Sequence, residues 1–220
     1  TFTKKFTINK GANYVRVGVL DDSNKNQIVL SSGHIYKLLG TTLTTEWNFN
    51  TSGEGYVELS DIDKDNKKEV IFAQSWYYIY VYDADTKTTK YSIKSDLDIQ
   101  ALTMADTDND GVDELYYGDG QWGEVYCHNS ATGALMWSVN NPEHGVTAIN
   151  YADLNNDGNK ELIWGAGWTS TGADYLYIYS KAQSKLLWRS EDIVGPFYAT
   201  ATGDVDGDGK DDCVLGAANG

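Results

Sequence analysis

Apolar residues along the chain gather in short runs separated by polar turns, a pattern that predicts β-strands. One set of runs reads "QIVLSS", "EVIFAQS", "ELYYGDG", "ELIWGAG" and "DCVLGAANG", and a second set follows it as "HIYKLLG", "YIYVYDA", "EVYCHNS" and "YLYIYSK". A third set comes next as "TEWNFN", "KYSIKS", "LMWSVN" and "LWRSED", and a run such as "IQALTMAD" precedes the first set. No segment shows the 3.6-residue period of an amphipathic helix. The pattern predicts an all-β chain built from units of four short antiparallel strands.

Acidic loops mark the repeat that joins these strands. They read "DIDKDNKKE" from Asp61, "DTDNDGVDE" from Asp106, "DLNNDGNKE" from Asp153 and "DVDGDGKDD" from Asp204, at intervals of 45, 47 and 51 residues. An altered copy, "VLDDSNKNQ", starts at Val19, 42 residues before the first of the four. Four-stranded repeats of about 40–50 residues are typical of β-propeller blades, which must stack to bury both faces of each sheet. We therefore expect one β-propeller domain over residues 1–220.

About five repeats are visible, and the last is incomplete. Their approximate bounds are residues 10–50, 55–95, 98–140, 146–192 and 197–220. Residues 2–9 offer a closing strand for the last repeat, and the alternative is that the chain is a fragment of a larger propeller. The fragment is favoured, since a blade without an inner strand exposes unpaired backbone groups. One aromatic residue recurs in each repeat and is expected to pack between blades: Phe6, Trp47, Tyr91, Trp137 and Trp188.

The D-x-D/N-x-D-G-x-x-D/E loops, with "GAG" at 165–167 and "GAA" at 216–218, resemble the FG-GAP family of calcium-binding β-propeller repeats. This family is also called VCBS, and integrin α-subunits carry repeats of this kind. The resemblance covers essentially the whole chain, although the Val19 copy has Val19 and Gln27 in place of the first and last acids and "IFAQS" lacks the glycine.

The spacing of the loops predicts calcium ligands. Ca²⁺ takes six to eight oxygen ligands, which side chains at positions 1, 3, 5 and 9 and a backbone carbonyl at position 7 can supply. The sixth position must turn sharply, commonly with positive φ, and it holds Gly111, Gly158 and Gly209, with Asn66 in the Asp61 loop. An EF-hand is excluded, because it needs its Glu at position 12 and flanking helices. The expected metal ligands are Asp61, Asp63, Asp65, Lys67 and Glu69; Asp106, Asp108, Asp110, Val112 and Glu114; Asp153, Asn155, Asp157, Asn159 and Glu161; and Asp204, Asp206, Asp208, Lys210 and Asp212.

Charge supports about four bound Ca²⁺ ions, with none expected in the Val19 copy. The formal net charge is −15, and the side-chain ligand positions hold 15 of the 32 acidic residues. Gathered carboxylates repel one another without a counter-ion. We expect the ions to be structural and the Asp61 loop to bind most weakly, because it has Asn66 at its turn and Lys64, Lys67 and Lys68 close by.

Charge and composition also limit the partners and the compartment. The acidic balance argues against nucleic acid, and no apolar stretch is long enough for membrane insertion. Loop-built calcium sites suit millimolar calcium, so an extracellular, cell-surface or periplasmic location is expected. Two cysteines, Cys127 and Cys213, are expected to be packed free thiols.

A second candidate site lies opposite the acidic loops, where exposed aromatics suit a glycan or protein ligand. Trp76, Trp122 and Trp168 fall at the turn between the second and third strands of their repeats, and the alternative is that they only cover hairpin ends. The connections between repeats carry Tyr56, Asp98, Glu143, His144, Phe197 and Tyr198.

Two functions follow from these patterns. The first is a calcium-stabilised extracellular binding module, with Tyr56, Trp76, Trp122, His144, Trp168 and Tyr198 as ligand-binding residues. The second is the propeller, or part of it, of a polysaccharide-active enzyme. Rhamnogalacturonan lyases are similar in that they also use calcium-binding propellers of this general kind. The sequence shows no converging acid–base pair and no nucleophile motif, which favours the binding module.

Overall fold

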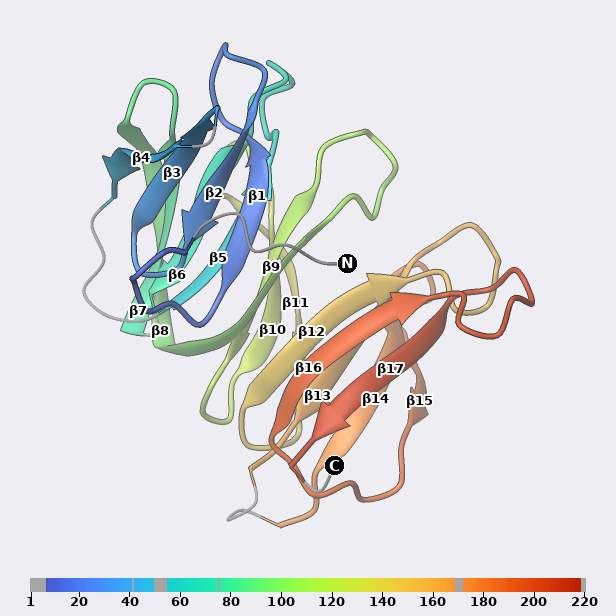
Figure 1. The fold of residues 1–220 in the computed structure, drawn as a ribbon. Coiled ribbons are helices and arrows are strands. Elements are labelled where there is room, and N and C mark those ends of the chain that lie inside the picture. The colour runs from blue at the N-terminus through green and yellow to red at the C-terminus, as the bar shows by residue number, and fades with distance from the viewer. Residues whose placement is uncertain (1–6, 41, 50–54, 75, 169–171, 219–220) are drawn as a thin grey trace, which may run out of the picture. The chain divides into compact units, whose positions relative to one another are not determined.

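The computed structural model describes residues 7–40, 42–49, 55–74, 76–168 and 172–218. These residues form seventeen β-strands and no helix, so the all-β prediction is confirmed (Figure 1). Accordingly, no helix there is long and apolar enough to cross a membrane. The chain divides into two compact units, Thr1–Ser95 with Ala131–Gly133, and Asp96–Ser130 with Ala134–Gly220.

The first unit holds two runs of antiparallel strands. One sheet has the order β1 (Val15–Val19), β2 (Asn26–Leu30), β3 (His34–Leu39) and β4 (Thr42–Asn48). The other run has the order β5 (Gly55–Ser60), β6 (Glu69–Gln74), β7 (Trp76–Asp83) and the first half of β8 (Thr88–Ala105). The core of the first unit includes Val29, Phe49, Val70 and Phe72.

The second unit continues the same strand order. The second half of β8 leads to β9 (Glu114–Asp119), β10 (Glu124–His128) and β11 (Leu135–Asn140). A four-stranded sheet follows with β12 (Val146–Ala152), β13 (Glu161–Ala166), β14 (Tyr175–Ser180) and β15 (Lys185–Arg189), and then the pair β16 (Phe197–Gly203) and β17 (Asp212–Ala217). Strands β9 and β13 are buried along their whole length and carry much of the core.

Strand β8 differs from the expected pattern. The sequence predicts two strands there, one ending a repeat and one opening the next, whereas the structure has one continuous strand of 18 residues. The segment "KSDLDIQ" at its centre has neither glycine nor proline, so nothing in it favours a turn. The other connections between repeats contain a glycine, a proline or both.

The proposed closing strand at residues 2–9 is not tested. Residues 1–6, which include Phe6, lie outside the described residues, and residues 7–9 belong to no strand. The two strands β16 and β17 agree with an incomplete last repeat.

The recurring aromatic residue packs as expected at two positions but not at a third. Trp47 lies 5.7 Å from Tyr82 of the following repeat, and Trp137 lies 6.4 Å from Tyr179 of the following repeat, measured between ring centroids. Trp188 is 49% exposed. The β16–β17 pair that follows it has no third described strand that would cover Trp188.

Both cysteines are free, as the sequence predicts. Cys127 is fully buried among apolar residues of the second unit, and burial raises the pKa of its thiol to about 12. Cys213 packs partly buried against a second cluster that contains Phe197. Both thiols are therefore core groups.

A glycine near the end of the second strand lets the next repeat approach closely. In the second unit, a Cβ placed on Gly165 would lie 2.6 Å from Cδ2 of Phe197, and one on Gly118 would clash with Val146. Phe197 and Val146 both open the first strand of the following repeat. The glycine of the repeat signature is thus a packing residue in these two sheets.

Gly165→Ala should therefore destabilise the second unit by about 1–3 kcal/mol through overpacking. The matched control is Gly216→Ala at the same place in β17, where an added Cβ meets no described atom within 4 Å. We expect this control to change stability by less than about 0.5 kcal/mol. Urea unfolding would measure both changes, and equal stabilities for the two variants would contradict the packing role.

Candidate functional site

The acidic loops join the first and second strands of each repeat, and one hydrogen bond recurs in all of them. The carboxylate of the ninth loop residue, which opens the second strand, accepts a hydrogen bond from the backbone N–H of the second. In the altered loop, Gln27 Oε1 accepts the same bond from Leu20 at 3.0 Å, so an amide replaces the acid. The acidic pairs are Ile62–Glu69, Thr107–Glu114, Leu154–Glu161 and Val205–Asp212, at 3.1, 2.9, 3.0 and 3.0 Å.

The first and fifth residues organise the rest of each loop. The first carboxylate accepts from the N–H of the sixth residue, as Asp106 does from Gly111 at 3.0 Å. The fifth carboxylate accepts from the N–H of the seventh, as Asp110 does from Val112 at 2.7 Å. The other acidic loops repeat both bonds. The accepting carboxylates at the first and fifth positions are those of Asp61 and Asp65, Asp153 and Asp157, and Asp204 and Asp208. The ligand role expected for the carbonyl of the seventh residue stays a prediction.

Two loop positions adopt the left-handed backbone conformation, although the sequence pointed to only one. The sixth residue does so in all five loops: Asn24, Asn66, Gly111, Gly158 and Gly209. The fourth does so in the four acidic loops: Lys64, Asn109, Asn156 and Gly207. Asparagine and glycine tolerate positive φ better than other residues, so their presence at the fourth position was the available signal.

In three of the four acidic loops the side chains at positions one, three and nine converge. One oxygen from each carboxylate lies within 4.8 Å of the others in the groups Asp61–Asp63–Glu69, Asp106–Asp108–Glu114 and Asp204–Asp206–Asp212. The loop that starts at Asp153 has Asn155 at its third position, and this amide donates to Glu161 at 3.1 Å. The fifth carboxylates, expected as ligands, belong to none of these groups.

The Asp106 group is suited to bind a cation. Oδ1 of Asp106 is buried and has no hydrogen-bond partner among the described residues. Glu114 is only 6% exposed, and burial raises the pKa of its carboxyl, to which the nearby charges of Asp108 and Asp106 add. No lysine or arginine of the described chain lies within 4.0 Å of these three carboxylates. Hard oxygen donors that lack a positive partner are the arrangement Ca²⁺ prefers.

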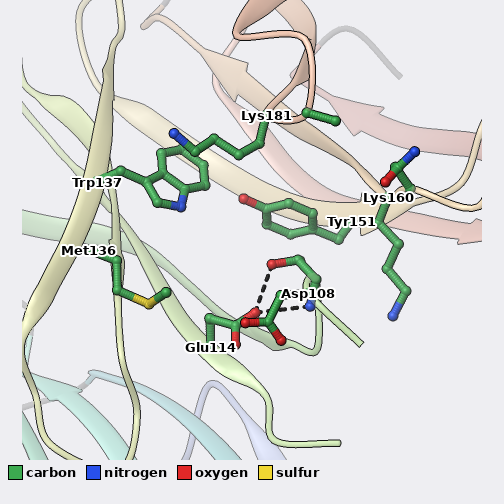
Figure 2. Close-up of a pocket in the computed structure, with 10 residues that line it drawn as sticks. Asp108, Glu114, Met136, Trp137, Tyr151, Lys160 and Lys181 are labelled. Atoms are coloured by element: carbon green, nitrogen blue, oxygen red, sulfur yellow. Dashed lines mark hydrogen bonds between the residues drawn. The ribbon is translucent and has the colours of Figure 1, made fainter. Parts of the chain in front are cut away.

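A cavity of about 360 Å³ opens beside this group (Figure 2). Trp137 and Met136 of β11 form one wall, and Figure 2 shows the Met136 side chain extending toward Glu114. Lys181 lies 4.9 Å from the centre of the Trp137 ring, and Lys160 donates to the backbone carbonyl of Asp106 at 2.9 Å. The lysines near the Asp106 loop thus contact an aromatic ring and a carbonyl.

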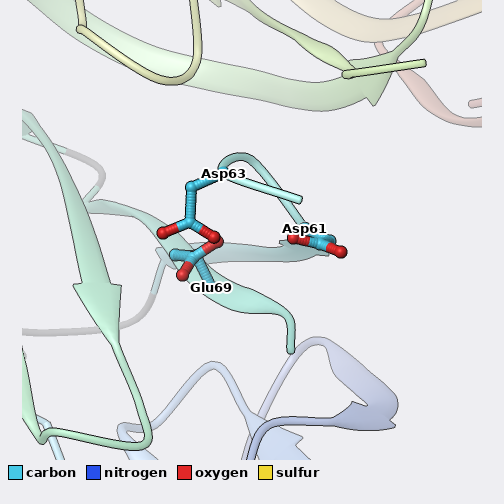
Figure 3. Close-up of side chains that lie close together, drawn as sticks. All are labelled: Asp61, Asp63 and Glu69. Carbon is cyan, nitrogen blue, oxygen red and sulfur yellow. The ribbon is translucent and has the colours of Figure 1, made fainter. Parts of the chain in front are cut away.

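The Asp61 group differs, because a lysine ammonium lies on it. Lys90 Nζ is 2.6 Å from Asp63 Oδ2 and 3.2 Å from Glu69 Oε1. Figure 3 shows the carboxylates of Asp63 and Glu69 close together, with Asp61 beside them. Burial opposes the charge on Lys90, yet the two carboxylates raise its pKa above the ordinary value. Among these groups, this one already has a positive partner from the chain.

The aromatic residues expected to bind a ligand fall in both units. In the first unit, Trp76 is 60% exposed and its ring lies 6.0 Å from that of Tyr77, whose backbone is left-handed. Tyr56 is half-buried, 4.9 Å from the ring of Tyr14.

In the second unit, Trp122 is 64% exposed with a φ of 51°, and its ring meets His144 edge-on at 5.2 Å. Gly145 follows, and an added Cβ there would lie 2.6 Å from the indole nitrogen of Trp168. The structure therefore brings Trp122, His144 and Trp168 into one neighbourhood. Tyr198 is 70% exposed on β16, whereas its neighbour Phe197 is buried and cannot contribute to a ligand surface.

No family model and no curated protein matches the chain. Solved structures do: BBS1N in complex with ARL6DN, soaked with mercury, at 17% identity and a TM-score of 0.64, and the same complex soaked with lead, at 16% and 0.62. The matches cover 94% and 98% of this chain, which spans 62% and 63% of those chains. BBS1N is a β-propeller, so the likeness supports a propeller fold and, at this identity, shows the fold alone.

The ninth loop residue has two expected roles, because it accepts the hydrogen bond from the second residue and is an expected metal ligand. Glu114→Gln separates these roles. In EDTA this variant should melt at or above the temperature of the unmodified chain, because the amide can keep the bond to Thr107, as Gln27 does to Leu20, without burying a charge. Glu114→Ala loses the bond and should be less stable by about 1–3 kcal/mol. Melting curves in EDTA and in 1 mM calcium (about 100 times a Kd near 10 µM) would test this, with Glu114→Gln gaining less from calcium. If Glu114→Gln were as unstable in EDTA as Glu114→Ala, the negative charge itself would be needed without metal.

Proposed function

We propose that this chain is a calcium-stabilised β-propeller module, with the visible repeats as its blades, that binds a protein partner through exposed aromatic side chains. The observation that carries the metal half is the Asp106 group. One buried carboxylate oxygen there has no hydrogen-bond partner among the described residues, and no lysine or arginine of the described chain lies within 4.0 Å of the three carboxylates. The Asp204 group and the Asp153 loop share its hydrogen-bond pattern.

The ions would be structural. The Asp106 and Asp153 loops close hairpins whose second strands, β9 and β13, are buried throughout. An ion that binds only the folded state stabilises that state by mass action. Since loop sites of this kind suit millimolar calcium, the proposal includes an extracellular or periplasmic location.

The partner half rests on Trp122. A left-handed backbone conformation costs a residue other than glycine roughly 1–2 kcal/mol. Tryptophan side chains are also largely buried in most proteins. Trp122 carries both costs, because its φ is 51° and its side chain is 64% exposed. Strain of this kind gathers at functional sites, and tryptophan is enriched among residues that dominate protein interfaces.

The comparison supports a protein rather than a glycan as the partner. BBS1N was crystallised in complex with ARL6DN, so a propeller of similar fold is found with a protein bound. The chain covers only part of that propeller, and the identity is low, so the partner itself does not carry over.

The test is binding of the whole chain, in 1 mM calcium (the concentration range of extracellular calcium sites), to an array of secreted proteins and to an array of glycans. We expect protein ligands whose binding falls at least about tenfold in Trp122→Ala, as loss of an interface residue worth more than 1.4 kcal/mol requires. Trp188→Ala is the matched control, because Trp188 is an exposed tryptophan of the same unit and lies at the end of β15. Binding to glycans alone, or turnover of an arrayed polysaccharide, would contradict the protein-binding proposal.

A further inference from the structure

The acidic loops share their backbone conformation. Their repeats differ in one residue, which is far from the loop in the sequence and stands directly before the recurring aromatic residue. Lys90 stands directly before Tyr91, the recurring aromatic of its repeat. The residues directly before Trp137 and Trp188 are Met136 and Leu187. In those two repeats this residue falls at a β-bulge, where the register shifts between β10 and β11 and between β14 and β15.

The same position therefore carries an ammonium in one repeat and an apolar side chain in two others. At the Asp61 group, Lys90 contacts two of the three converging carboxylates. At the Asp106 group, Met136 lines the cavity next to Glu114 and offers no charge. The chemistry of the loop is alike in both cases, so the strand residue decides whether the group has a positive partner.

Other lysines of the first unit neutralise the neighbouring acids. Lys37 pairs with Asp21 of the altered loop at 2.5 Å. Lys67 pairs with Asp85 at 2.7 Å and with Asp22 at 3.0 Å. The sequence attributed the weakness of the Asp61 loop to Lys64, Lys67 and Lys68, whereas the lysine that lies on the converging carboxylates is Lys90.

We infer that Lys90 is a built-in counter-ion that takes the place of the metal in the Asp61 loop. A Ca²⁺ ion there would have to displace the ammonium and leave it as a like charge nearby, which opposes binding. The first unit then keeps its acidic loop without metal, while the loops of the second unit depend on calcium. Three sites follow instead of the four expected from the spacing. This inference rests on the proposed calcium binding.

The test is calorimetric titration of the whole, EDTA-stripped chain with calcium alone. The unmodified chain should bind three ions, and Lys90→Met, which copies Met136, should bind a fourth. Lys94→Met is the matched control, since Lys94 is an exposed lysine of the same strand, and it should still bind three. Hydrogen exchange should place the new calcium-dependent protection of Lys90→Met at residues 61–69. Lys90→Gln, a milder change that also removes the charge, should behave likewise if Lys90→Met folds poorly.

The outcomes separate the inference from the proposal beneath it. Four ions in the unmodified chain and four in Lys90→Met would overturn the role of Lys90 and leave the calcium proposal standing. Three ions in both, with Lys90→Gln also unchanged, would do the same. No calcium bound by the unmodified chain would overturn the calcium proposal, and no gain in Lys90→Met would then overturn the role of Lys90 as well.

Discussion

The structure depends on holding three acidic side chains within a few ångströms at the head of a hairpin. The ninth loop residue opens the second strand, so burial of that strand draws its carboxylate into the interior, as with Glu114 at 6% exposure. There it accepts the N–H of the second loop residue and sets the turn. A buried carboxylate beside two others is costly unless a positive charge comes with it. Where three carboxylates converge at this turn, a positive charge beside them therefore stabilises the fold.

The repeats deal with this carboxylate charge in different ways. In the first unit the lysines are themselves the cations, and Lys90 reaches the loop from a strand 21 residues beyond Glu69. The altered loop avoids the problem in part, because Gln27 makes the structural bond without a charge. In the second unit no described lysine or arginine lies within 4.0 Å of the carboxylates of the Asp106 group, and by our proposal an external divalent ion supplies the positive charge. One repeated hairpin thus accommodates an ammonium or an amide, and by our proposal a metal.

Much of the fold could be predicted, because a period of 42 to 51 residues carries the strand order and the loops with it. The convergence of positions one, three and nine follows from that spacing, and so does the left-handed sixth residue. What escaped prediction depends on contacts across the sheet. Lys90 is 27 residues from Asp63, and no local pattern links them. The exposure of Trp188 depends on which strand covers it. The continuous β8 is different, because its signal, the lack of glycine and proline at its centre, is present in the sequence.

The aromatic site was predicted less completely for the same reason. Position in the repeat placed Trp76 and Trp122 at exposed hairpin ends, and both are exposed. The sequence places Phe197 on the same face, in a connection between repeats, but the space left by Gly165 lets its ring pack into the core. Whether an aromatic side chain faces water or a neighbouring sheet is decided by the space that the next repeat leaves.

Thermal unfolding of the whole chain in 1 mM calcium and in EDTA tests the central claim most directly. A single site with a Kd near 10 µM would add roughly 2.7 kcal/mol at that calcium concentration, a sizeable part of the 5–15 kcal/mol that typically holds a domain together. The account predicts a melting transition that moves down by many degrees when calcium is removed and returns when it is restored. Melting curves that coincide in calcium and in EDTA would show that the acidic groups are stable without a metal, and would contradict the account.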